Sequence, residues 1–217
     1  MGEDLSNKSL SILVIIALVI SFGGTLIFYS KLQGININAA ATTDQAVARI
    51  NITSRASINF TIDRVDWGTG SVNESASYCT LNTEGLNPAS NCTNFTTVTQ
   101  GLRLENDGNR NVALNISTNN TPAQFIGGFN PVYQWKFTNN ESDSCGSQGV
   151  GSSCVTNATA LQPQNYSTVS TTPTQVCPCF RAADPSDLIG IELQIRVPAD
   201  SYSGLRDSTI TAVGTAI

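Results

Sequence analysis

Residues 9–30 read SLSILVIIALVISFGGTLIFYS and contain no charged side chain. A helix of about 20 apolar residues, rising ~1.5 Å per residue, spans the ~30 Å hydrocarbon core of a bilayer. The sequence therefore predicts a short cytoplasmic stub at residues 1–9, a transmembrane helix at residues 10–30 in contact with membrane lipid, and a large domain beyond it. Gly23 and Gly24 would allow close packing against another helix, although isolated glycines are common in such helices.

Two features bear on whether this helix is a retained anchor or a cleaved signal peptide. The apolar run is longer than the 7–15 residues of a usual signal-peptide core, which favours a retained anchor. The small residues 39–41 (AAA) offer a cleavage site, but they lie well beyond the run. Lys8 and Lys31 flank the helix on opposite sides, so the positive-inside rule does not orient it.

The polar segment beyond the helix has the composition of a folded extracellular domain. It carries nine basic and 14 acidic residues, and this balance argues against a nucleic-acid partner. Charged residues make up only 12% of the chain, against about a quarter in average proteins, and Asn, Thr and Ser take their place. Val, Ile, Leu and Phe recur in patterned runs, so the segment is long and apolar enough to bury a core.

Cysteines and glycosylation sequons orient the chain. The six cysteines, an even number, all follow the helix, as expected for disulfides in an oxidising compartment. They are Cys79, Cys92, Cys145, Cys154, Cys177 and Cys179. Ten N-x-S/T sequons also follow it, at Asn51, Asn59, Asn73, Asn91, Asn94, Asn115, Asn119, Asn140, Asn157 and Asn165. N-glycosylation requires the outer face of a membrane. We therefore predict a single-pass protein of the cell membrane with its C-terminal domain outside.

Period-two alternation of apolar and polar residues predicts strands with one buried face. In the clearest run, Ile189, Ile191, Leu193, Ile195 and Val197 alternate with polar residues or glycine. Strands are predicted at 47–52, 57–63, 132–138, 188–197 and 207–217.

A β-hairpin is predicted at residues 102–116. Leu102 and Leu104 precede a turn at Asp107-Gly108, and an alternating run from Val112 to Ile116 follows it. Asp-Gly suits a tight turn that requires positive φ.

Seven or eight short strands without an amphipathic helix after the membrane predict a mainly β fold, an antiparallel immunoglobulin-like β-sandwich over residues 44–217. The sequon residues Asn51, Asn59 and Asn115 fall in the polar phase of their predicted strands, where a glycan fits. Residues 31–43 are predicted as a linker, and residues 68–97 and 139–175 as long loops held by disulfides.

The composition argues against most enzyme classes. The chain has no histidine, which removes His-based triads, His metal ligands and the usual general base near neutral pH. A Ser-Lys pair would require a lysine, and Lys136 is the only lysine beyond Lys31. Nothing singles out a carboxylate pair, so we predict no enzyme activity and no cofactor.

Cys177-Pro178-Cys179 has two interpretations. A redox or metal site is one, but zinc sites prefer C-x2–4-C pairs and a bond between cysteines two apart is strained. The favoured interpretation is two structural disulfides to partners elsewhere, such as Cys145 and Cys154. Cys79 and Cys92 are expected to pair, because both lie in one predicted loop.

Three further features resemble binding sites, and each has a simpler structural explanation. The oxygen-rich turns 105–109 (ENDGN) and 184–187 (DPSD) superficially resemble calcium loops but lack the alternating acidic spacing. Trp67 and Trp135 are possible platforms for sugar stacking, although such residues more often pack in a core.

The layout resembles that of small archaeal cell-surface proteins, in which a hydrophobic helix precedes a glycosylated β-sandwich. Archaeal type IV pilins and archaellins share this layout, and their helices form a filament core. Thread-like pilins complete their sandwich with a strand from a neighbour, for which residues 44–53 are the candidate here. The ending 197–217 (VPADSYSGLRDSTITAVGTAI) also looks like the final strand pair of extracytoplasmic Ig-like domains. The chain departs from the pilin pattern because no basic leader ending in Gly or Ala directly precedes the apolar run.

Three functions remain at this point. The first is a structural or adhesive cell-surface glycoprotein anchored by its helix. The second is a subunit that self-assembles into a filament, by helix bundling or strand donation, or into a surface layer. The third is a calcium- or carbohydrate-binding module.

Overall fold

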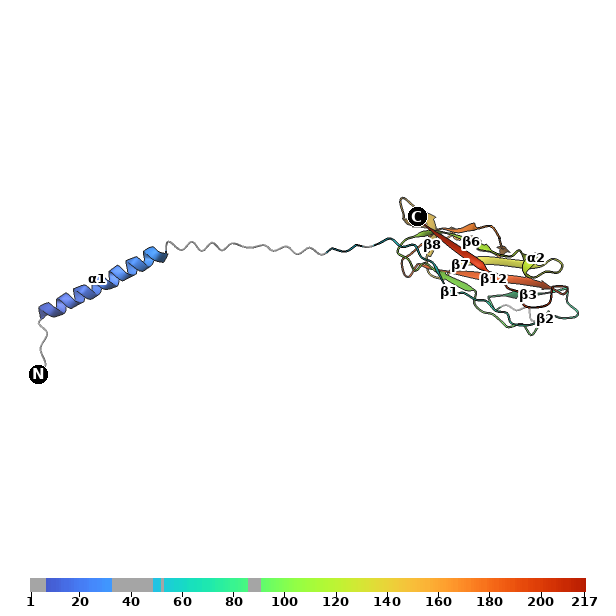
Figure 1. Cartoon of the computed structure of the whole chain (residues 1–217), viewed down its shortest axis with the longest axis horizontal. Coiled ribbons are helices and arrows are strands. Elements are labelled where there is room, and N and C mark those ends of the chain that lie inside the picture. The colour runs from blue at the N-terminus through green and yellow to red at the C-terminus, as the bar shows by residue number, and fades with distance from the viewer. Residues whose placement is uncertain (1–6, 33–48, 52, 86–90) are drawn as a thin grey trace. The chain divides into compact units, whose positions relative to one another are not determined.

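The computed structural model describes residues 7–32, 49–51, 53–85 and 91–217. Contacts divide the chain into two units, residues 1–51 and residues 52–217 (Figure 1). The predicted cleavage site at 39–41, most of the linker and most of segment 44–53 lie outside the described residues.

Helix α1, Asn7–Leu32, confirms the predicted apolar helix and begins inside the predicted stub. Its span Lys8–Ser30 is long and apolar enough to cross a bilayer, a property that a signal sequence near the N-terminus shares. Apart from Gly23, the side chains of this span are exposed. Its hydroxyl groups bond within the helix: Thr25 Oγ1 donates to the carbonyl of Ser21 at 2.6 Å, and Ser30 Oγ to that of Ile27 at 2.9 Å. Such bonds would pair these hydroxyl groups inside a bilayer, where no water is present to do so.

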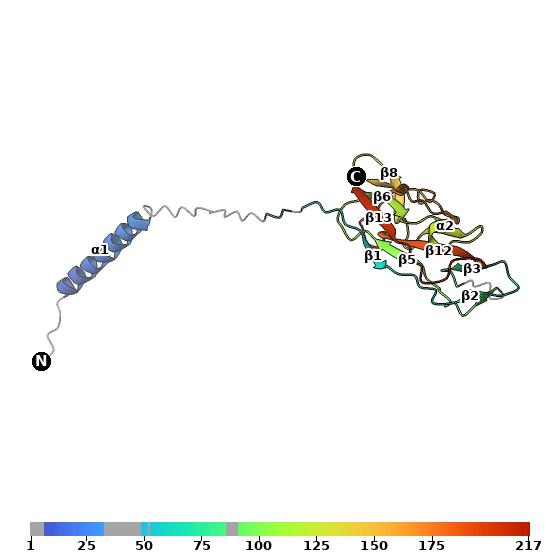
Figure 2. The same ribbon diagram turned by 45° about the vertical axis from the view of Figure 1, so that its right-hand side comes forward.

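The second unit is an antiparallel β-sandwich, which confirms the predicted fold class. One sheet has the strand order β1-β5-β12-β7-β10, and β3 pairs with β12 as well. The other has the order β13-β6-β11-β8-β9, and β2 pairs with β4 in a small third sheet (Figure 2).

The strands of the first sheet are β1 Asn59–Ile62, β3 Tyr78–Asn82, β5 Leu102–Glu105, β7 Val132–Asn139, β10 Ser167–Thr168 and β12 Leu188–Pro198. Those of the second are β6 Val112–Thr118, β8 Cys145–Gln148, β9 Cys154–Thr156, β11 Thr174–Phe180 and β13 Ile210–Ala216, and the small sheet has β2 Ser71–Val72 and β4 Cys92–Thr93. A single helical turn, α2 Pro122–Phe125, follows β6.

Strand β12 is the centre of the first sheet. Along one edge it pairs with β7 from Ile189 to Arg196, and along the other with β5 and then with β3. Its odd-numbered residues face the interior of the sandwich, as the alternation predicted, and Ile189 and Ile191 are fully buried. Opposite them the second sheet contributes buried residues such as Leu114 and Phe180. Burying each such side chain is worth about 1.5–3 kcal/mol.

The predicted hairpin at 102–116 is wrong. Strand β5 belongs to the first sheet and β6 to the second, so the connection around Asp107-Gly108 crosses between sheets. Buried Asn106 holds this connection, because its Nδ2 donates to the carbonyls of Arg110 and Phe180 at 3.0 and 3.1 Å. Both strands point apolar residues at the same core from opposite sides, and alternation does not distinguish this arrangement from a hairpin.

The two long predicted loops contain strands. Residues 68–97 include β2, β3 and β4, and residues 139–175 include β8, β9, β10 and the first two residues of β11. Strand β3 is part of the core because Cys79 and Leu81 are fully buried. The disulfides therefore join strands as well as closing loops. The pairs are Cys79–Cys92, Cys145–Cys177 and Cys154–Cys179, which confirms the expected pairing and the structural interpretation of Cys177-Pro178-Cys179.

The other predicted strands were located with mixed accuracy. Those at 57–63, 132–138 and 188–197 correspond to β1, β7 and β12, and the last strand begins at Ile210, three residues later than predicted. Strand β11 was missed. Within the predicted strand 47–52, described residues 49–51 form no strand, and Ile50 is exposed.

Candidate functional site

A cleft of about 950 Å³ lies on the inner face of the first sheet, bordered by the segments 63–72 and 199–209 and by α2. Its lining extends along β12 from Leu193 to Pro198. The polypeptide enters the domain at the other end of β12, where the carbonyl of Arg55 accepts from Asn109 N and where Leu188 pairs with Glu105. The cleft therefore lies toward the end of the sandwich opposite its point of attachment.

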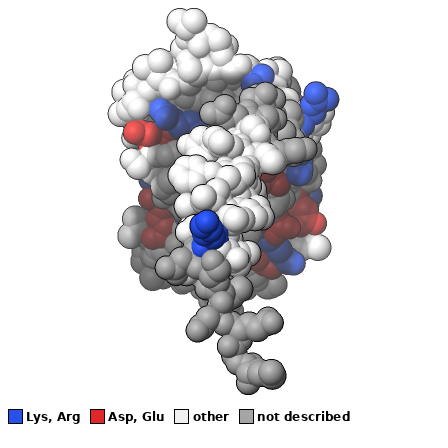
Figure 3. Space-filling view, turned by 90° about the vertical axis from the view of Figure 1, so that its left-hand side faces the viewer, with Lys and Arg blue, Asp and Glu red and all other residues white. Residues whose placement is uncertain are grey.

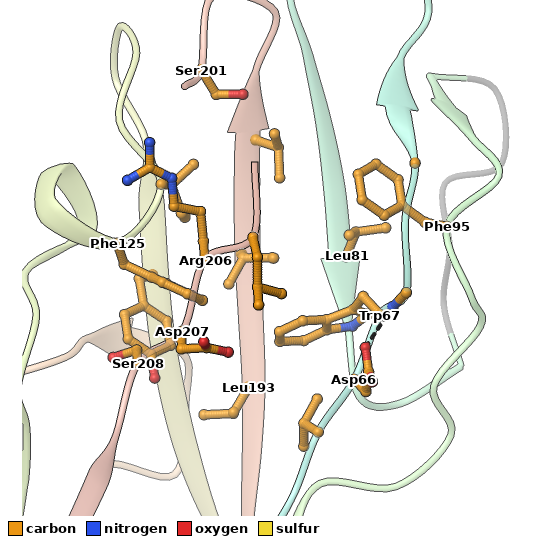
Figure 4. Close-up of a pocket in the computed structure, with 18 of the residues that line it drawn as sticks. Asp66, Trp67, Leu81, Phe95, Phe125, Leu193, Ser201, Arg206, Asp207 and Ser208 are labelled. Atoms are coloured by element: carbon orange, nitrogen blue, oxygen red, sulfur yellow. Dashed lines mark hydrogen bonds between the residues drawn. The ribbon is translucent and has the colours of Figure 1, made fainter. Parts of the chain in front are cut away.

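The floor of the cleft is the apolar face of the first sheet. Leu193, Ile195 and Val197 of β12, Leu81 of β3 and Tyr133 of β7 line it. The second sheet covers the other half of β12, and here residues of the segments 63–72 and 199–209 lie on either side of the floor (Figure 4). Alternation along β12 explains why these side chains face the cleft.

One wall is the segment 63–72, which carries Trp67. The indole Nε1 donates to the carbonyl of Asn82 at 3.4 Å, and Trp67 O accepts from Thr96 N at 2.8 Å. Gly70 packs directly on the ring of Phe95, where a Cβ would approach the ring atoms to 2.5 Å. These contacts fix Trp67 and Phe95 on the same side of the cleft (Figure 4).

The opposite wall combines α2 with the connection 199–209. Thr121 and Gln124 form a capping box that begins α2, and Phe125 at its end packs against Tyr133 with ring centroids 4.9 Å apart. The ring of Tyr202 lies against the backbone of Gly127, which has φ +75° and no room for a Cβ. The Arg206 guanidinium lies 5.1 Å from the centroid of the Tyr202 ring.

The lining of the cleft carries charges of both signs, three acidic (Asp63, Asp66 and Asp207) and two basic (Arg64 and Arg206). Asp66 accepts from Gly68 N at 2.8 Å and from Arg64 at 2.6 Å, and these bonds, first the backbone one, lower the pKa of Asp66. Arg206 and Asp207 lie on the other side. Burial raises the pKa of Tyr133 on the floor, so its hydroxyl is neutral near pH 7. The arrangement suits an uncharged ligand surface that stacks on aromatic rings and has polar groups at its edge.

A second cluster joins three carboxylates at the other end of the sandwich. The oxygens of Glu141, Asp184 and Asp187 lie within 4.8 Å of one another. Partial burial and the nearby charge of Glu141 raise the pKa of Asp187 to about 6. Asn106 N donates to the carbonyl of Asp187 at 2.9 Å, so the fold brings the two oxygen-rich turns 105–109 and 184–187 together. Hard cations such as Ca²⁺ prefer oxygen ligands of this kind.

A polar network covers the outer face of the first sheet. Glu192 is buried and accepts from Arg103 at 2.9 Å and from Thr83 Oγ1 at 2.5 Å. Beside it, Lys136 Nζ donates to Glu84 at 2.7 Å, and this bond lowers the pKa of Glu84. The contacts pair the charges with one another, and they engage Lys136 with a carboxylate rather than a serine.

The ten sequon asparagines all lie at exposed or half-buried positions. Asn59 and Asn115 point to the outer faces of their strands, as predicted, whereas Asn51 lies in no strand. Of the asparagines that the structure describes, Asn82 and Asn106 are buried, and both are outside sequons. Glycosylation itself stays a prediction.

On the face drawn in Figure 3, basic and acidic side chains are interspersed among neutral ones rather than gathered in a basic patch.

The structure separates the two tryptophans. Trp135 is buried in the core, 5.7 Å from Phe137 between ring centroids, whereas Trp67 lines the cleft. Sequence reasoning missed Phe125 and Tyr202 in the cleft and Glu141 in the acidic cluster. The glycine pair Gly127-Gly128, with both residues at positive φ, was the one local signal near the cleft.

No protein-family model, curated protein or solved structure shows significant similarity to this chain.

Proposed function

We propose that this chain is a single-pass, N-glycosylated protein of the cell membrane whose extracellular β-sandwich has an adhesive or structural role. The observation that carries the adhesive role is the aromatic cleft at the end of the sandwich opposite its attachment point. Helix α1 is the anchor. The cleft is the contact surface, because it is a recess of about 950 Å³ whose lining includes the half-buried rings of Trp67, Phe95 and Phe125 and the exposed ring of Tyr202.

Three observations support the extracellular location. All six cysteines form disulfides, which persist in oxidising compartments. None of the ten sequon asparagines is buried. The apolar helix precedes this domain and contains no charge between Ser9 and Ser30.

Location is tested with the full-length chain in intact cells. Protease added outside should release the β-domain and leave α1 in the membrane, and a glycosidase should lower the mass of the released domain. Protection of the domain until the cells are lysed would contradict the proposed orientation. Release of an intact domain without protease would identify α1 as a cleaved signal sequence.

Adhesion is tested by displaying the full-length chain on non-adherent cells and measuring their aggregation. Trp67→Ala and Tyr202→Ala should each reduce aggregation at least threefold. Val150→Ala is the matched control, because Val150 is 96% exposed and does not line the cleft. Equal aggregation by all variants would remove the cleft from adhesion.

A filament subunit is the second candidate. The observation that favours it is the apolar character of α1 on all its faces, since a helix inside a bundle needs no polar side. Electron microscopy of native membranes should then show filaments whose subunits resist boiling in detergent. A monomer under those conditions argues against this candidate.

A calcium-binding module is the third candidate, and the cluster of Glu141, Asp184 and Asp187 favours it. Calcium should raise the Tm of the full chain, and a chelator should reverse the increase. An unchanged Tm contradicts it.

A further inference from the structure

In the part of the chain that the structure describes, the two large sheets have five edge strands that differ in their protection, because β3, off the main path, pairs with β12 alone; β3 has five residues and is tied by the disulfide Cys79–Cys92. An edge strand exposes backbone N–H and C=O groups to any added strand, and proteins usually protect it by shortness, charge, proline or a bulge. Strand β10 has two residues, β9 has three and a disulfide at Cys154, and β1 has a register shift between Phe60 and Ile62. These three edges are therefore short or irregular.

Strand β13 has none of these devices. It spans seven residues, Ile210–Ala216 (ITAVGTA), with no charge and no proline. Its register with β6 is regular from Ile210 to Ala216. Within the described residues β13 pairs with β6 alone, so its other edge is open (Figure 2).

The hydrogen-bonding phase of β13 shows which backbone groups face this open edge. Asn119 N donates to Thr209 O, and Ile217 N donates to Asn111 O, so the odd-numbered residues bond toward β6. Because the direction alternates along an antiparallel strand, the N–H and C=O groups of the even-numbered residues point to the open edge. These residues are Ile210, Ala212, Gly214 and Ala216.

This phase is self-complementary about Val213. If two β13 strands run antiparallel with Val213 on a two-fold axis, Ile210 meets Ala216 of the other copy and Ala212 meets Gly214. Both are pairs of even-numbered residues, so all of them exchange hydrogen bonds, about eight in total. Thr211 then faces Thr215, and Val213 faces Val213, in the close non-hydrogen-bonded positions where β-branched pairs are favourable.

We propose that two copies of this chain associate edge to edge through β13, antiparallel and centred on Val213, so that their second sheets form one continuous sheet. The partner adds at the edge rather than on the face. Asn115, a predicted glycosylation site, lies opposite Val213 on the outer face, so a glycan there would occupy the face of the sheet rather than its edge. The proposal does not depend on the function proposed above.

Cysteine cross-linking of the full-length chain in detergent or nanodiscs tests the register. All six native cysteines are in disulfides, so Val213→Cys introduces a single thiol, and a non-hydrogen-bonded cross-strand pair suits disulfide geometry. We expect most of this variant to become a reducible dimer on mild oxidation. Val155→Cys on the edge strand β9 is the control, with a similarly exposed valine, 55% against 47%. Equal or slower cross-linking of V213C overturns the proposal.

A charge-pair experiment separates β13 from other contacts. Val213 is half exposed, so Val213→Lys and Val213→Glu should fold with Tm values close to that of the native chain. Each should dimerise at least tenfold more weakly, because like charges meet on the axis, and an equimolar mixture should recover the dimer. Dimerisation of each variant alone at native strength would place the contact on α1 or another surface and overturn the proposal. So would a mixture that stays monomeric.

Discussion

The two halves of β12 have the same alternating sequence but different surroundings. Ile189 and Ile191 are fully buried beneath the second sheet, in the same core cluster as Phe180, Cys145 and Cys177. Leu193 and Ile195 continue the same face and are also buried, with 4% and 6% of their surface exposed, but they border the cleft. Alternation fixes which side of a strand is apolar, and the rest of the chain fixes what covers it. One half of β12 is thus covered by a sheet, and the other half is covered by the side chains of loops and of α2 that border the cleft.

The largest loss of stability is expected from a substitution beneath the second sheet. Phe180→Ala should lower the free energy of unfolding by about 4 kcal/mol, because it leaves an enclosed cavity in addition to the lost burial. Leu193→Ala should cost about 2 kcal/mol, since the cleft already adjoins that side chain. Guanidinium unfolding of the full chain in detergent measures both. Equal losses would mean that the cleft is closed in solution.

The disulfides at the two ends of the sandwich are expected to contribute different amounts of stability. Removing Cys145–Cys177, with a sequence separation of 32, should cost about 4 kcal/mol in the chain-entropy account, and removing Cys79–Cys92, with a separation of 13, about 3 kcal/mol. Paired Cys→Ala variants and their unfolding midpoints test this order. The reverse order would show that the Cys79–Cys92 bond, at the cleft end, holds the native packing of β3 as well as closing a loop.

The sequence predicted the half under the second sheet better than the half at the cleft, for a physical reason. Strands with one buried face, such as β7 and β12, are recognised by the alternation of apolar and polar residues. The even number of cysteines predicted the disulfides. Pairing partners are set by contacts distant in the chain, so β5 and β6 looked like a hairpin although they lie in different sheets. Strand β11 was missed because its cysteines and proline, TQVCPCF, hide the alternation.

Most residues that line the cleft could not be predicted from the sequence. Trp67 was singled out only as one of two tryptophans, and nothing in the sequence separated it from buried Trp135. Phe125 and Tyr202 lie far apart in the chain and meet the cleft only because α2 and the connection 199–209 fold over the same end of β12. The acidic cluster was predicted in part, because the turn 184–187 was identified as oxygen-rich but Glu141 was not.

A smaller effect comes from the acidic cluster near the half of β12 that the second sheet covers. The pKa of Asp187 in the folded chain is about 6, above the ordinary value of 3.8. The folded state therefore binds the proton more tightly, and this contribution to stability is complete below about pH 4 and is lost as the pH rises through 6. Because Asp187 is partly exposed, we expect the loss to be about 1 kcal/mol.

Asp187→Asn should remove this dependence. The Tm of the native chain, measured from pH 4 to pH 7 without calcium, should fall relative to that of the variant as the pH rises. Asp207→Asn, at the cleft end, is the control and should follow the native profile. Parallel profiles for the native chain and D187N would show that the three carboxylates do not interact in the folded state.

Tyr202→Ala should have the smallest effect on stability but should make Trp67 in the cleft more accessible. Tyr202 is 62% exposed, and its ring contacts the backbone of Gly127 and the guanidinium of Arg206, so Tyr202→Ala should change the free energy of unfolding by less than about 0.5 kcal/mol. The same change removes part of the wall opposite Trp67. Of the two tryptophans, Trp135 is 3% exposed and shielded from a quencher, so acrylamide quenching of fluorescence reports Trp67. Quenching should increase in Y202A and stay unchanged in V150A. An unchanged Y202A would mean that Trp67 is already fully accessible and that the 199–209 wall does not limit entry to the cleft.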